Sequence, residues 1–518
     1  MTCLSMFRTR AGRTARTMLF VFLLLAVAAP VTWADDQPAP RPKYVFLMIG
    51  DGMGAAQRFA AELFKAAVSD REVTDPKVKL TMNKLPVQGM MTTHAKDSAI
   101  TDSAAAGTAM ASGLKTASGV VGKDASGIAP YPTLAEKAKA RGMKVAILTT
   151  VSIDHATPAC FYAHQKSRRE YYEIGRQLVD SPFDFFAGGA FKKPRGGDGT
   201  RENLLDLCAE KGFKVVTDLD GFEALKPEAG RAVALFPDNV DRGSMDYEID
   251  RLDGSQPSLA DMTRKAVEMV SGDRGFFMMV EGGKIDWSCH AHDAVTTIRD
   301  TLAFDEAVRA AYEFYRRHPK ETLIVVTADH ETGGMTIGYA LSKYSTHFDR
   351  LAGQTMSSVA FTKRFNALKK KHDDRLTLEK TAPLLREAFG LLLLEPGEIE
   401  ALAARAKDGD AKAARRRGMA LTPYEIAKLQ AALAMSLQGK KVRPRNEDTY
   451  LNYGYYEPFT VAALRVLGAK AGVGWTTFSH TATPVPVSAI GVGAETFGGY
   501  YDNTELSKKL ETVMGIGE

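Results

Sequence analysis

Short apolar runs, separated by stretches with a helical pattern, constrain the fold of this chain more than any other feature. Unbroken apolar runs of this length are typical of strands that are buried on both faces. They cover residues 44–49, 145–148, 276–280, 322–327 and 485–491. Helical patterns lie between them, for example at residues 134–141 and 259–270. This alternation predicts an α/β fold with a mostly parallel central sheet and helices on both faces.

Polar residues that can bind metal ions follow four of these five strands. They are Asp51 after the first strand, Asp154 and His155 after the second, Glu281 after the third, and Asp329 and His330 after the fourth. Binding sites in open α/β sheets lie at the carboxyl ends of the strands. We therefore expect these side chains to meet at one edge of the sheet.

The stretch from residue 341 to residue 472 breaks the alternation of strands and helices. It is rich in Ala, Lys and Arg, with helical patterns at residues 401–417 and 423–437. We expect a large helical insertion, acting as a cap or an interface element, within one catalytic domain that covers residues 35–518. Its basic run at residues 412–417 is typical of a solvated helix face rather than of a binding patch.

The first 34 residues have the features of a secretory signal peptide. Arginines at positions 8, 10, 13 and 16 precede an apolar run at residues 18–29, and Thr32 and Ala34 stand at suitable cleavage positions. The alternative is an uncleaved membrane anchor, but the apolar run is shorter than the roughly 20 residues that a membrane span needs. The sequence therefore predicts a secreted or periplasmic protein without a stable membrane anchor.

Charge and cysteine content exclude two further classes of protein. The chain has 67 basic and 62 acidic residues, and the leader carries four arginines and no acid, so the remainder is near +1. Because basic and acidic residues are almost equal in number, the sequence predicts no nucleic-acid partner. Outside the leader only Cys160, Cys208 and Cys289 remain, which allows one internal disulfide at most and leaves open whether it forms. Because no CxxC pair is present, any metal ion must be bound by Asp, Glu and His.

Two short segments have residue patterns that suit metal binding and anion binding. If a helical turn begins at Asp286, His290 lies four residues later on the same face, a spacing that suits Zn²⁺. The small residues after Ser103 suit a tightly packed helix start, where backbone N–H groups and the helix dipole favour anions. Each segment can also be explained as an ordinary helix cap. No GxSxG motif surrounds Ser103, so metal coordination is the remaining route to an activated hydroxyl.

Five motifs carry a family resemblance. They are IGDGMG from residue 49, TDSA from residue 101, VEG from residue 280, TADH from residue 327 and SHT from residue 479. In this order they resemble the alkaline phosphatases, from about Tyr44 to the C-terminus apart from the insertion. The resemblance implies hydrolysis of phosphate monoesters to an alcohol and inorganic phosphate through a phosphoserine on Ser103. It also implies two Zn²⁺ and one Mg²⁺ per chain.

The resemblance implies a role for each metal-binding position. Asp286, His290 and His480 match the ligands of one zinc ion. The ligands implied for the second zinc ion are Asp51, Asp329, His330 and the Ser103 oxygen. Those implied for magnesium are Asp51, Glu281 and Thr157, together with His155 at the position where the best-known enterobacterial type has Asp.

The resemblance also implies contacts with the substrate. Arg168 matches the arginine that holds the phosphate through two hydrogen bonds, and Arg169 remains the alternative. Trp287 stands where the enterobacterial type has Lys, and the pair of His155 and Trp287 looks like marine bacterial members. A neutral histidine implies a weaker third metal site, and the lost lysine implies weaker retention of phosphate. Asp154, one position away, is not expected to be a ligand.

Other functions fit this sequence less well. A phosphodiesterase or nucleotide pyrophosphatase on the same fold typically has a Thr nucleophile and lacks the acids of the third metal site. A sulfatase would show a Cys- or Ser-x-Pro-x-Arg motif, and a phosphoglycerate mutase would lack the secretion signal. A non-catalytic metal- or phosphate-binding protein is the alternative from another class. The expected partners are small phosphate monoesters, with the chain acting as a homodimer or a monomer.

Overall fold

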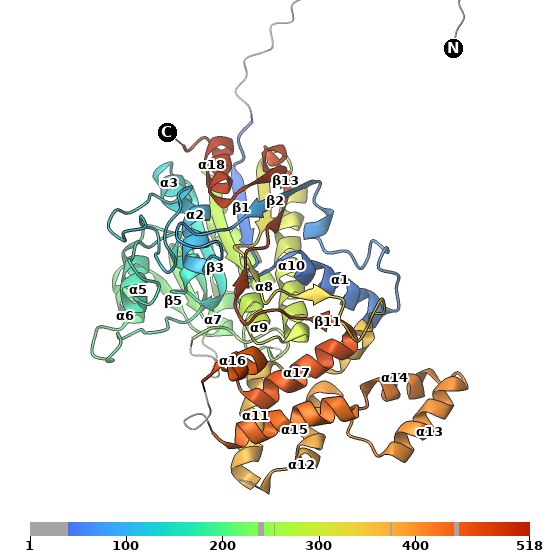
Figure 1. The fold of residues 1–518 in the computed structure, drawn as a ribbon. Helices are drawn as coiled ribbons and strands as arrows, with labels where there is room; N and C mark the ends of the chain where they lie inside the picture. The colour runs from blue at the N-terminus through green and yellow to red at the C-terminus, as the bar shows by residue number, and fades with distance from the viewer. Residues whose placement is uncertain (1–39, 237–242, 253, 373–374, 440–444, 518) are drawn as a thin grey trace, which may run out of the picture. The chain divides into compact units, whose positions relative to one another are not determined.

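A computed structural model describes residues 40–236, 243–252, 254–372, 375–439 and 445–517 of the chain. The expected signal peptide, residues 1–34, lies outside these described residues. A central sheet organises residues 40–517, with helices packed around it (Figure 1). Within the described ranges, no helix has both the length and the apolar character that crossing a membrane requires.

The central sheet has ten strands, and nearly all of them are parallel. In spatial order they are β14 (Gly499–Asp502), β2 (Val87–Thr92), β13 (Val485–Gly491), β8 (Thr322–Thr327), β1 (Tyr44–Ile49), β7 (Phe276–Glu281), β3 (Lys144–Ser152), β4 (Phe185–Gly189), β6 (Ala232–Leu235) and β5 (Lys214–Val216). β13 runs antiparallel to β2 and β8, and the other described neighbours pair in parallel. The predicted α/β fold with a mostly parallel sheet is confirmed.

The four strands that lead to the polar residues are adjacent, in the order β8, β1, β7 and β3. Every residue of β1, β7 and β8 is buried, as their unbroken apolar sequences require. The register aligns their ends, because Ile49 lies opposite both Thr327 and Glu281. The residues that follow these strands therefore emerge side by side at one edge.

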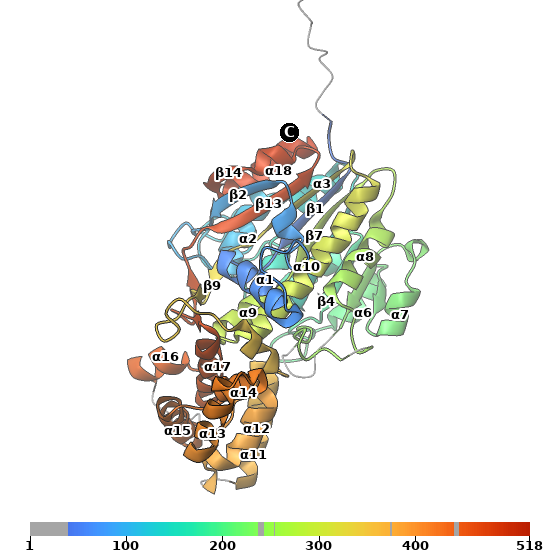
Figure 2. The same cartoon turned by 90° about the vertical axis from the view of Figure 1, so that its right-hand side faces the viewer.

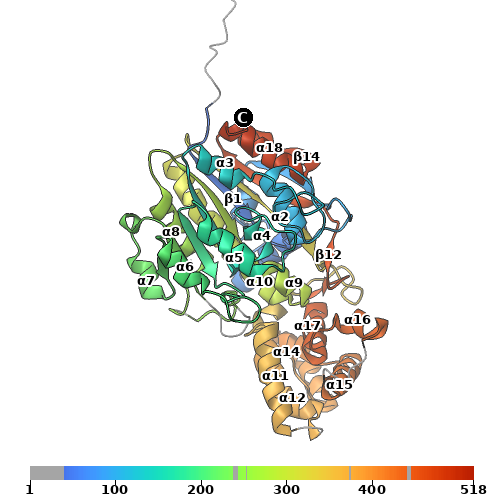
Figure 3. The ribbon, with the colours of Figure 1, turned by 90° about the vertical axis from the view of Figure 1, so that its left-hand side faces the viewer.

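Helices cover both faces of the sheet. In Figure 2 the helices α1 (Ala55–Ser69), α8 (Leu259–Val270) and α10 (Ala294–Arg317) lie in front of the sheet. Figure 3 shows α2 (Ser103–Ser112), α3 (Leu134–Ala140), α5 (Tyr171–Asp180) and α18 (Asn503–Met514) on the opposite face. The shorter helices of this part are α4 (Ala156–Ala159), α6 (Leu204–Glu210), α7 (Leu219–Ala224) and α9 (Lys284–His290).

Seven helices occupy most of the stretch from residue 341 to residue 472. They are α11 (Ser358–His372), α12 (Leu378–Phe389), α13 (Pro396–Lys407), α14 (Ala411–Met419), α15 (Pro423–Leu437), α16 (Glu447–Tyr453) and α17 (Pro458–Ala471). Figures 1 and 2 show them gathered next to α9, beyond the carboxyl ends of the parallel strands.

The helical pattern at residues 401–417 is divided between two helices rather than continuous. α13 ends before Gly409, whose φ of +91° is a left-handed conformation that glycine adopts without strain. Asp410 then caps α14 by accepting a hydrogen bond from the backbone N–H of Ala413 at 2.9 Å. Turn chemistry at residues 408–410 therefore overrides the helical composition on either side of it.

Candidate active site

Ser103 is the first residue of α2, and it is only 1% exposed. Asp102 caps the helix through a hydrogen bond from the backbone N–H of Ala105 at 3.0 Å. All ten residues of α2 are buried, which their small side chains allow. The Oγ atom of Ser103 lies 3.3 Å from Nε2 of His330. The structure therefore places this hydroxyl at a helix N-terminus, against a histidine that follows β8.

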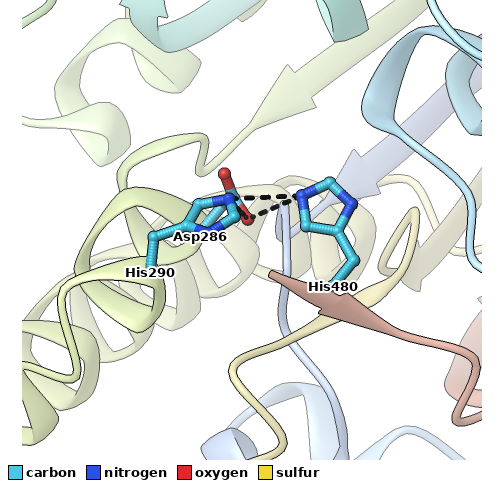
Figure 4. Close-up of side chains that lie close together, drawn as sticks. All are labelled: Asp286, His290 and His480. Atoms are coloured by element: carbon cyan, nitrogen blue, oxygen red, sulfur yellow. Dashed lines mark hydrogen bonds and ion pairs between the residues drawn. The ribbon is translucent and has the colours of Figure 1, made fainter. Parts of the chain in front are cut away.

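Asp286, His290 and His480 form a first cluster beside Ser103, and each directs a ligand atom toward the others (Figure 4). Nε2 of His290 lies 3.3 Å from Oδ1 of Asp286 and 3.2 Å from Nε2 of His480. Asp286 and His290 are both on α9, as the four-residue spacing predicts. His480 comes from β12 (His480–Thr481), far along the chain.

Backbone carbonyls fix both imidazoles of this cluster. Nδ1 of His290 lies 2.7 Å from the carbonyl oxygen of Phe478, and Nδ1 of His480 lies 2.8 Å from that of Thr101. A carbonyl oxygen only accepts, so Nδ1 carries the proton and donates it in both rings. Each Nε2 then faces the centre of the cluster, where it offers a lone pair to a metal ion once it is unprotonated, which is the arrangement of metal-binding histidines.

A second cluster contains Asp51, Asp329 and His330, all of them fully buried. Nε2 of His330 lies 3.4 Å from Oδ1 of Asp51 and 3.2 Å from Oδ2 of Asp329. The backbone N–H of Gly52 donates a hydrogen bond to Oδ1 of Asp329 at 3.1 Å. Gly52 has a φ of +72°, and a Cβ atom there would lie 2.9 Å from Cα of Asp286. Glycine at this position is therefore required by the close approach of α9.

The two clusters are held next to each other by a short antiparallel pair. β9 (Glu331–Thr332) pairs with β12, with Thr332 opposite His480. The rings of His330 and His480 stack with their centres 3.6 Å apart. The Thr332 hydroxyl donates to Oδ1 of Asp286 at 2.6 Å and lies 3.2 Å from Nδ1 of His330. One threonine therefore contacts both clusters.

A third group brings Asp51 together with His155 and Glu281. All three residues are buried. The Thr157 hydroxyl donates to Oδ2 of Asp51 at 3.4 Å. The Thr149 hydroxyl donates to Oε2 of Glu281. Asp51 therefore belongs to two groups at once, so it could bridge the ions of both.

Several atoms in these clusters have no hydrogen-bond partner although they are buried. They are Oδ1 of Asp51, Oε1 of Glu281, Oδ2 of Asp329 and Nδ1 of His155. Buried polar atoms are nearly always paired, and unpaired ones destabilise the fold. Bound cations would satisfy these oxygens. The carboxylates and imidazoles of the first two clusters suit Zn²⁺, whereas the third group is richer in oxygen and suits a harder ion. The residues present therefore fit metal ions.

The electrostatics of the clusters agree with this fit. Burial and the neighbouring carboxylates Asp329, Asp286 and Glu281 raise the pKa of Asp51 well above its usual value. Burial also raises the pKa of Glu281 to about 8, and Asp329 adds to the effect. Ionised carboxyl groups crowded in this way repel one another unless a cation lies between them.

The imidazoles of the first cluster differ from each other in their pKa. Burial and the nearby His330 lower the pKa of His480 to about 4. Burial also opposes protonation of His290, but the charge of Asp286 outweighs it and raises the pKa of His290 to about 9. The carboxylate that attracts a proton to His290 would attract a metal cation to the same place.

Arg168 lines the same cavity as Ser103. Its Nη1 donates to Oδ2 of Asp102 at 2.8 Å, and its Nη2 donates to Nε2 of His155 at 3.2 Å. Burial opposes ionisation of Asp102, but Arg168 and two backbone N–H groups hold the pKa of Asp102 below its usual value. Burial, Arg168 and Lys192 lower the pKa of His155 well below its usual value, so this imidazole is neutral. Arg169, the alternative, is exposed.

Trp287 stands beside His155, with the two rings edge to face and 5.8 Å between their centres. Behind it, Nζ of Lys284 lies 4.9 Å from the centre of the Trp287 ring and 3.7 Å from that of Tyr247. Lys284 is buried, and its ammonium group donates to the Ser244 hydroxyl at 3.2 Å. Trp287 therefore contacts both His155 and the buried Lys284.

Asp154 lies outside the three groups described above. Its carboxylate accepts hydrogen bonds from the backbone N–H of Lys192 at 2.9 and 3.2 Å. Burial raises the pKa of Asp154 to about 7. Cys160, Cys208 and Cys289 are buried and form no disulfide with one another.

A cavity of about 580 Å³ opens over the clusters. Ser103, Arg168, Trp287 and the first cluster form one wall. Residues of α11, of α17 and of the preceding loop form the facing wall, among them Ser358, Thr362, Tyr455, Tyr456 and Thr460. The helical stretch 341–472 therefore contributes directly to the space above Ser103.

The sequence analysis missed three residues of this site. Asp102 orients Arg168, Thr332 contacts two clusters, and Thr149 supports Glu281. Asp102 immediately precedes Ser103, and Thr332 lies two residues after His330, so their positions in the sequence could have indicated a role in the site. Thr149 lies inside a strand and gave no signal of its own.

Comparisons with known proteins show which proteins the chain is similar to. The family described as alkaline phosphatase matches residues 42–516 of the chain. Alkaline phosphatase 4 of Bacillus subtilis (strain 168) is 30% identical over 494 residues, covering 94% of this chain and 91% of that protein. Alkaline phosphatase 3 of the same strain is 31% identical over 479 residues, covering 90% and 88%.

Solved structures are similar as well. A cold-active alkaline phosphatase from Shewanella sp. aligns with a TM-score of 0.70 and 27% identity, covering 91% of this chain and 99% of that one. The alkaline phosphatase of Thermus thermophilus aligns with a TM-score of 0.72 and 24% identity, covering 92% of each chain. At 24% identity, the Thermus thermophilus structure shows a similarity of fold alone.

Proposed function

The chain belongs to the alkaline phosphatase family and is therefore a phosphoric monoester hydrolase, and on this premise we propose that Ser103 is its nucleophile. One observation carries the proposal: the Ser103 Oγ lies 3.3 Å from Nε2 of His330, at a helix N-terminus, in the cavity that Arg168 also lines. A hydroxyl in this position is close to a group that binds anions and to groups that bind cations.

The proposed reaction has two displacements at phosphorus. In the first, Ser103 Oγ bonds to phosphorus and loses its proton, the ester P–O bond breaks, and the departing alcohol oxygen gains a proton. In the second, water attacks the phosphoserine, restores the serine hydroxyl and releases inorganic phosphate. Uncatalysed hydrolysis of monoesters is so slow that positioning and charge stabilisation must together lower the barrier by roughly 20 kcal/mol.

We propose that two zinc ions and one magnesium ion bind at the three clusters. Asp286, His290 and His480 would hold one zinc ion, and the second cluster together with Ser103 would hold the other. Glu281, Asp51 and Thr157 would hold magnesium. When bound, such ions supply positive charge that lowers the pKa of a coordinated hydroxyl and stabilises developing negative charge. The unpaired buried oxygens of Asp51, Glu281 and Asp329 support this assignment.

Arg168 is proposed to hold the phosphoryl group. A guanidinium group presents a planar fork of donors that matches two phosphate oxygens. Asp102 keeps the side chain of Arg168 over the cavity, and His155 accepts its second N–H in the absence of substrate. Because His155 is neutral and Trp287 carries no charge, we expect phosphate to be held less tightly here than beside an extra cation.

Three further proposals concern the chain as a whole. Residues 1–34 would be removed as a signal peptide, which would make the enzyme secreted or periplasmic. Residues 35–518 would form the catalytic domain, with the stretch 341–472 as an inserted cap above the cavity that its residues line. The enzyme would act as a monomer or a homodimer.

The nucleophile is tested by replacing Ser103 with Ala and measuring hydrolysis of p-nitrophenyl phosphate at alkaline pH. We expect kcat to fall by about 1000-fold or more. Ser112→Ala is the matched control, because Ser112 lies on the same helix and donates to the Thr108 carbonyl outside the cavity. Undiminished activity of the Ser103 variant would exclude this residue as the nucleophile. Elemental analysis of the active enzyme should find about two zinc ions per chain.

A further inference from the structure

The cavity above Ser103 is larger than a phosphoryl group needs. Its volume of about 580 Å³ lies within the range of pockets that enclose drug-sized ligands. The attacking and leaving oxygens lie in line during phosphoryl transfer, so the alcohol portion of the substrate extends away from Ser103. The wall that faces Ser103 therefore contacts the alcohol portion.

Aromatic side chains continue this wall outward. A second hollow of about 360 Å³ adjoins the cavity, and the two share His290, Tyr455 and Tyr456. Tyr450 and Phe478 complete the aromatic lining of the second hollow. The rings of Tyr450 and Tyr455 lie 5.2 Å apart, and those of Tyr456 and Phe478 lie 6.1 Å apart. We call the surface of these four residues the aromatic groove.

Three of the four rings of the aromatic groove are exposed although they are large, and only Phe478 is buried. Tyr450, Tyr455 and Tyr456 are 36%, 48% and 39% exposed. The turn between α16 and α17 presents two of them, because Gly454 and Tyr455 have φ values of +55° and +64°. A left-handed conformation at a residue with a side chain is unfavourable, and such conformations cluster at functional sites. The turn is therefore built to present these rings beside His290.

The wall that faces Ser103 also carries hydroxyl groups. Ser358, Thr362 and Thr460 line it, and the hydroxyls of Thr362 and Thr460 lie 2.8 Å apart. A phosphate site, a hydroxyl-lined wall and a row of aromatic rings are the surfaces that would bind a phosphate, a sugar and a flat base.

We propose that the aromatic groove is a subsite for the alcohol portion of the substrate and that it favours monoesters with a planar ring, such as nucleoside monophosphates. The proposal rests on the proposed function, because it extends the same site. Stacking between a base and an aromatic side chain tolerates every base, since each has a flat face. The groove would therefore select for a ring without selecting a particular base.

Two substrates that differ only in the base test the proposal. Adenosine 5′-monophosphate and ribose 5-phosphate share the phosphate and the sugar, and kcat/KM is measured for both with the metal-loaded enzyme. We expect the wild-type enzyme to favour the nucleotide. In the double variant Tyr455→Ala/Tyr456→Ala, the ratio of the two kcat/KM values should fall by about tenfold, as stacking energies of bases predict.

Two further variants separate stacking from general damage. The double variant Tyr455→Phe/Tyr456→Phe keeps both ring planes and should keep the ratio within about twofold of wild type. Tyr500→Ala removes a more exposed tyrosine on β14, away from the cavity, and serves as the control.

The possible results are distinct. If the ratio of the two kcat/KM values in the Ala variant equals that of the wild-type enzyme, including the case in which both values fall by the same factor, the subsite is overturned and the proposed function remains in place. Loss of the ratio in the Phe variant would overturn stacking as its basis. If the wild-type enzyme hydrolyses neither substrate nor p-nitrophenyl phosphate, the proposed function fails and the subsite fails with it.

Discussion

Nη1 of Arg168 lies 2.8 Å from Oδ2 of Asp102, the residue that immediately precedes Ser103 and caps its helix. The same carboxylate accepts hydrogen bonds from the backbone N–H groups of Ala105 and Gly119. One side chain therefore fixes both the start of α2 and the guanidinium that faces it. A residue that need not contact the substrate therefore fixes the relative positions of Ser103, the proposed nucleophile, and Arg168, the proposed phosphate-binding residue.

The first prediction concerns this pair. Asp102→Asn keeps a good helix cap but removes the charge that orients Arg168. We expect the inhibition constant of inorganic phosphate to rise by about fivefold to tenfold, since a charge-assisted hydrogen bond contributes roughly 1.5 kcal/mol. Competition against p-nitrophenyl phosphate measures this. An inhibition constant equal to that of the wild-type enzyme would show that Arg168 needs no support from Asp102.

The second prediction concerns pH and metal removal. The folded-state pKa of Glu281 is about 8, above its ordinary 4.5. A carboxyl group with a raised pKa contributes stability below its ordinary pKa and loses that stability as the pH rises through its folded-state pKa. The metal-free protein should therefore lose thermal stability between about pH 5 and about pH 8, and added zinc and magnesium should restore more of it at the higher pH.

Thermal unfolding of chelator-treated protein across this pH range measures the effect. Glu281→Gln should reduce the slope for the metal-free protein, because the amide does not titrate. Glu505→Gln, an exposed carboxylate on α18, is the matched control. A metal-free protein whose stability rises over this interval would contradict the crowding of carboxylates as its cause.

The third prediction concerns Thr332, whose hydroxyl contacts Asp286 and His330. Thr332→Val preserves the shape of the side chain and removes the hydrogen bond to Asp286. Loss of such a support for a metal ligand typically weakens metal binding by about 10-fold to 100-fold. Competition with a zinc chelator measures the affinity, and Thr332→Ser should recover it. Equal zinc affinity in the Val variant would leave Thr332 with a packing role only.

The fourth prediction concerns the third group, which contains Asp51, His155 and Glu281 and is the proposed magnesium site. His155→Asp adds a carboxylate beside Asp51 and Glu281, where the wild-type protein has a neutral imidazole. Because Mg²⁺ prefers charged oxygen ligands, the concentration of Mg²⁺ for half-maximal activity should fall by about tenfold or more. His155→Asn is the uncharged control and should not produce this gain. A matching gain in the Asn variant would assign the effect to size rather than to charge.

Five of the ten strands of the central sheet, and the polar residues that follow four of them, were predictable from the sequence, because burial on both faces leaves an apolar run. Asp51, Glu281 and Asp329 each follow such a run, so their meeting at one edge followed from the parallel topology. His480 was different, because β12 is two residues long and has no pattern of its own. Only the family motif placed it, and only tertiary pairing with β9 brings it to Asp286.

The residues that form the facing wall of the cavity could not be predicted from the sequence. Tyr455 and Tyr456 belong to a turn in a stretch whose composition indicates helices in general. Their contribution depends on two left-handed residues and on the packing of α17, neither of which has a periodic signature. The break between α13 and α14 at Gly409 was not predicted either, because it depends on the conformation of a single turn.

The clusters gather residues from almost the whole length of the chain, from Asp51 to His480. Thr101 and His480, joined through a carbonyl and an imidazole, are separated by 379 residues. Contacts this distant in sequence slow folding, because closing such loops costs entropy before the contacts repay it. A polypeptide that stops before residue 480 would lack the last ligand of its first cluster. We therefore expect activity only in chains that have been completed through residue 480 and folded.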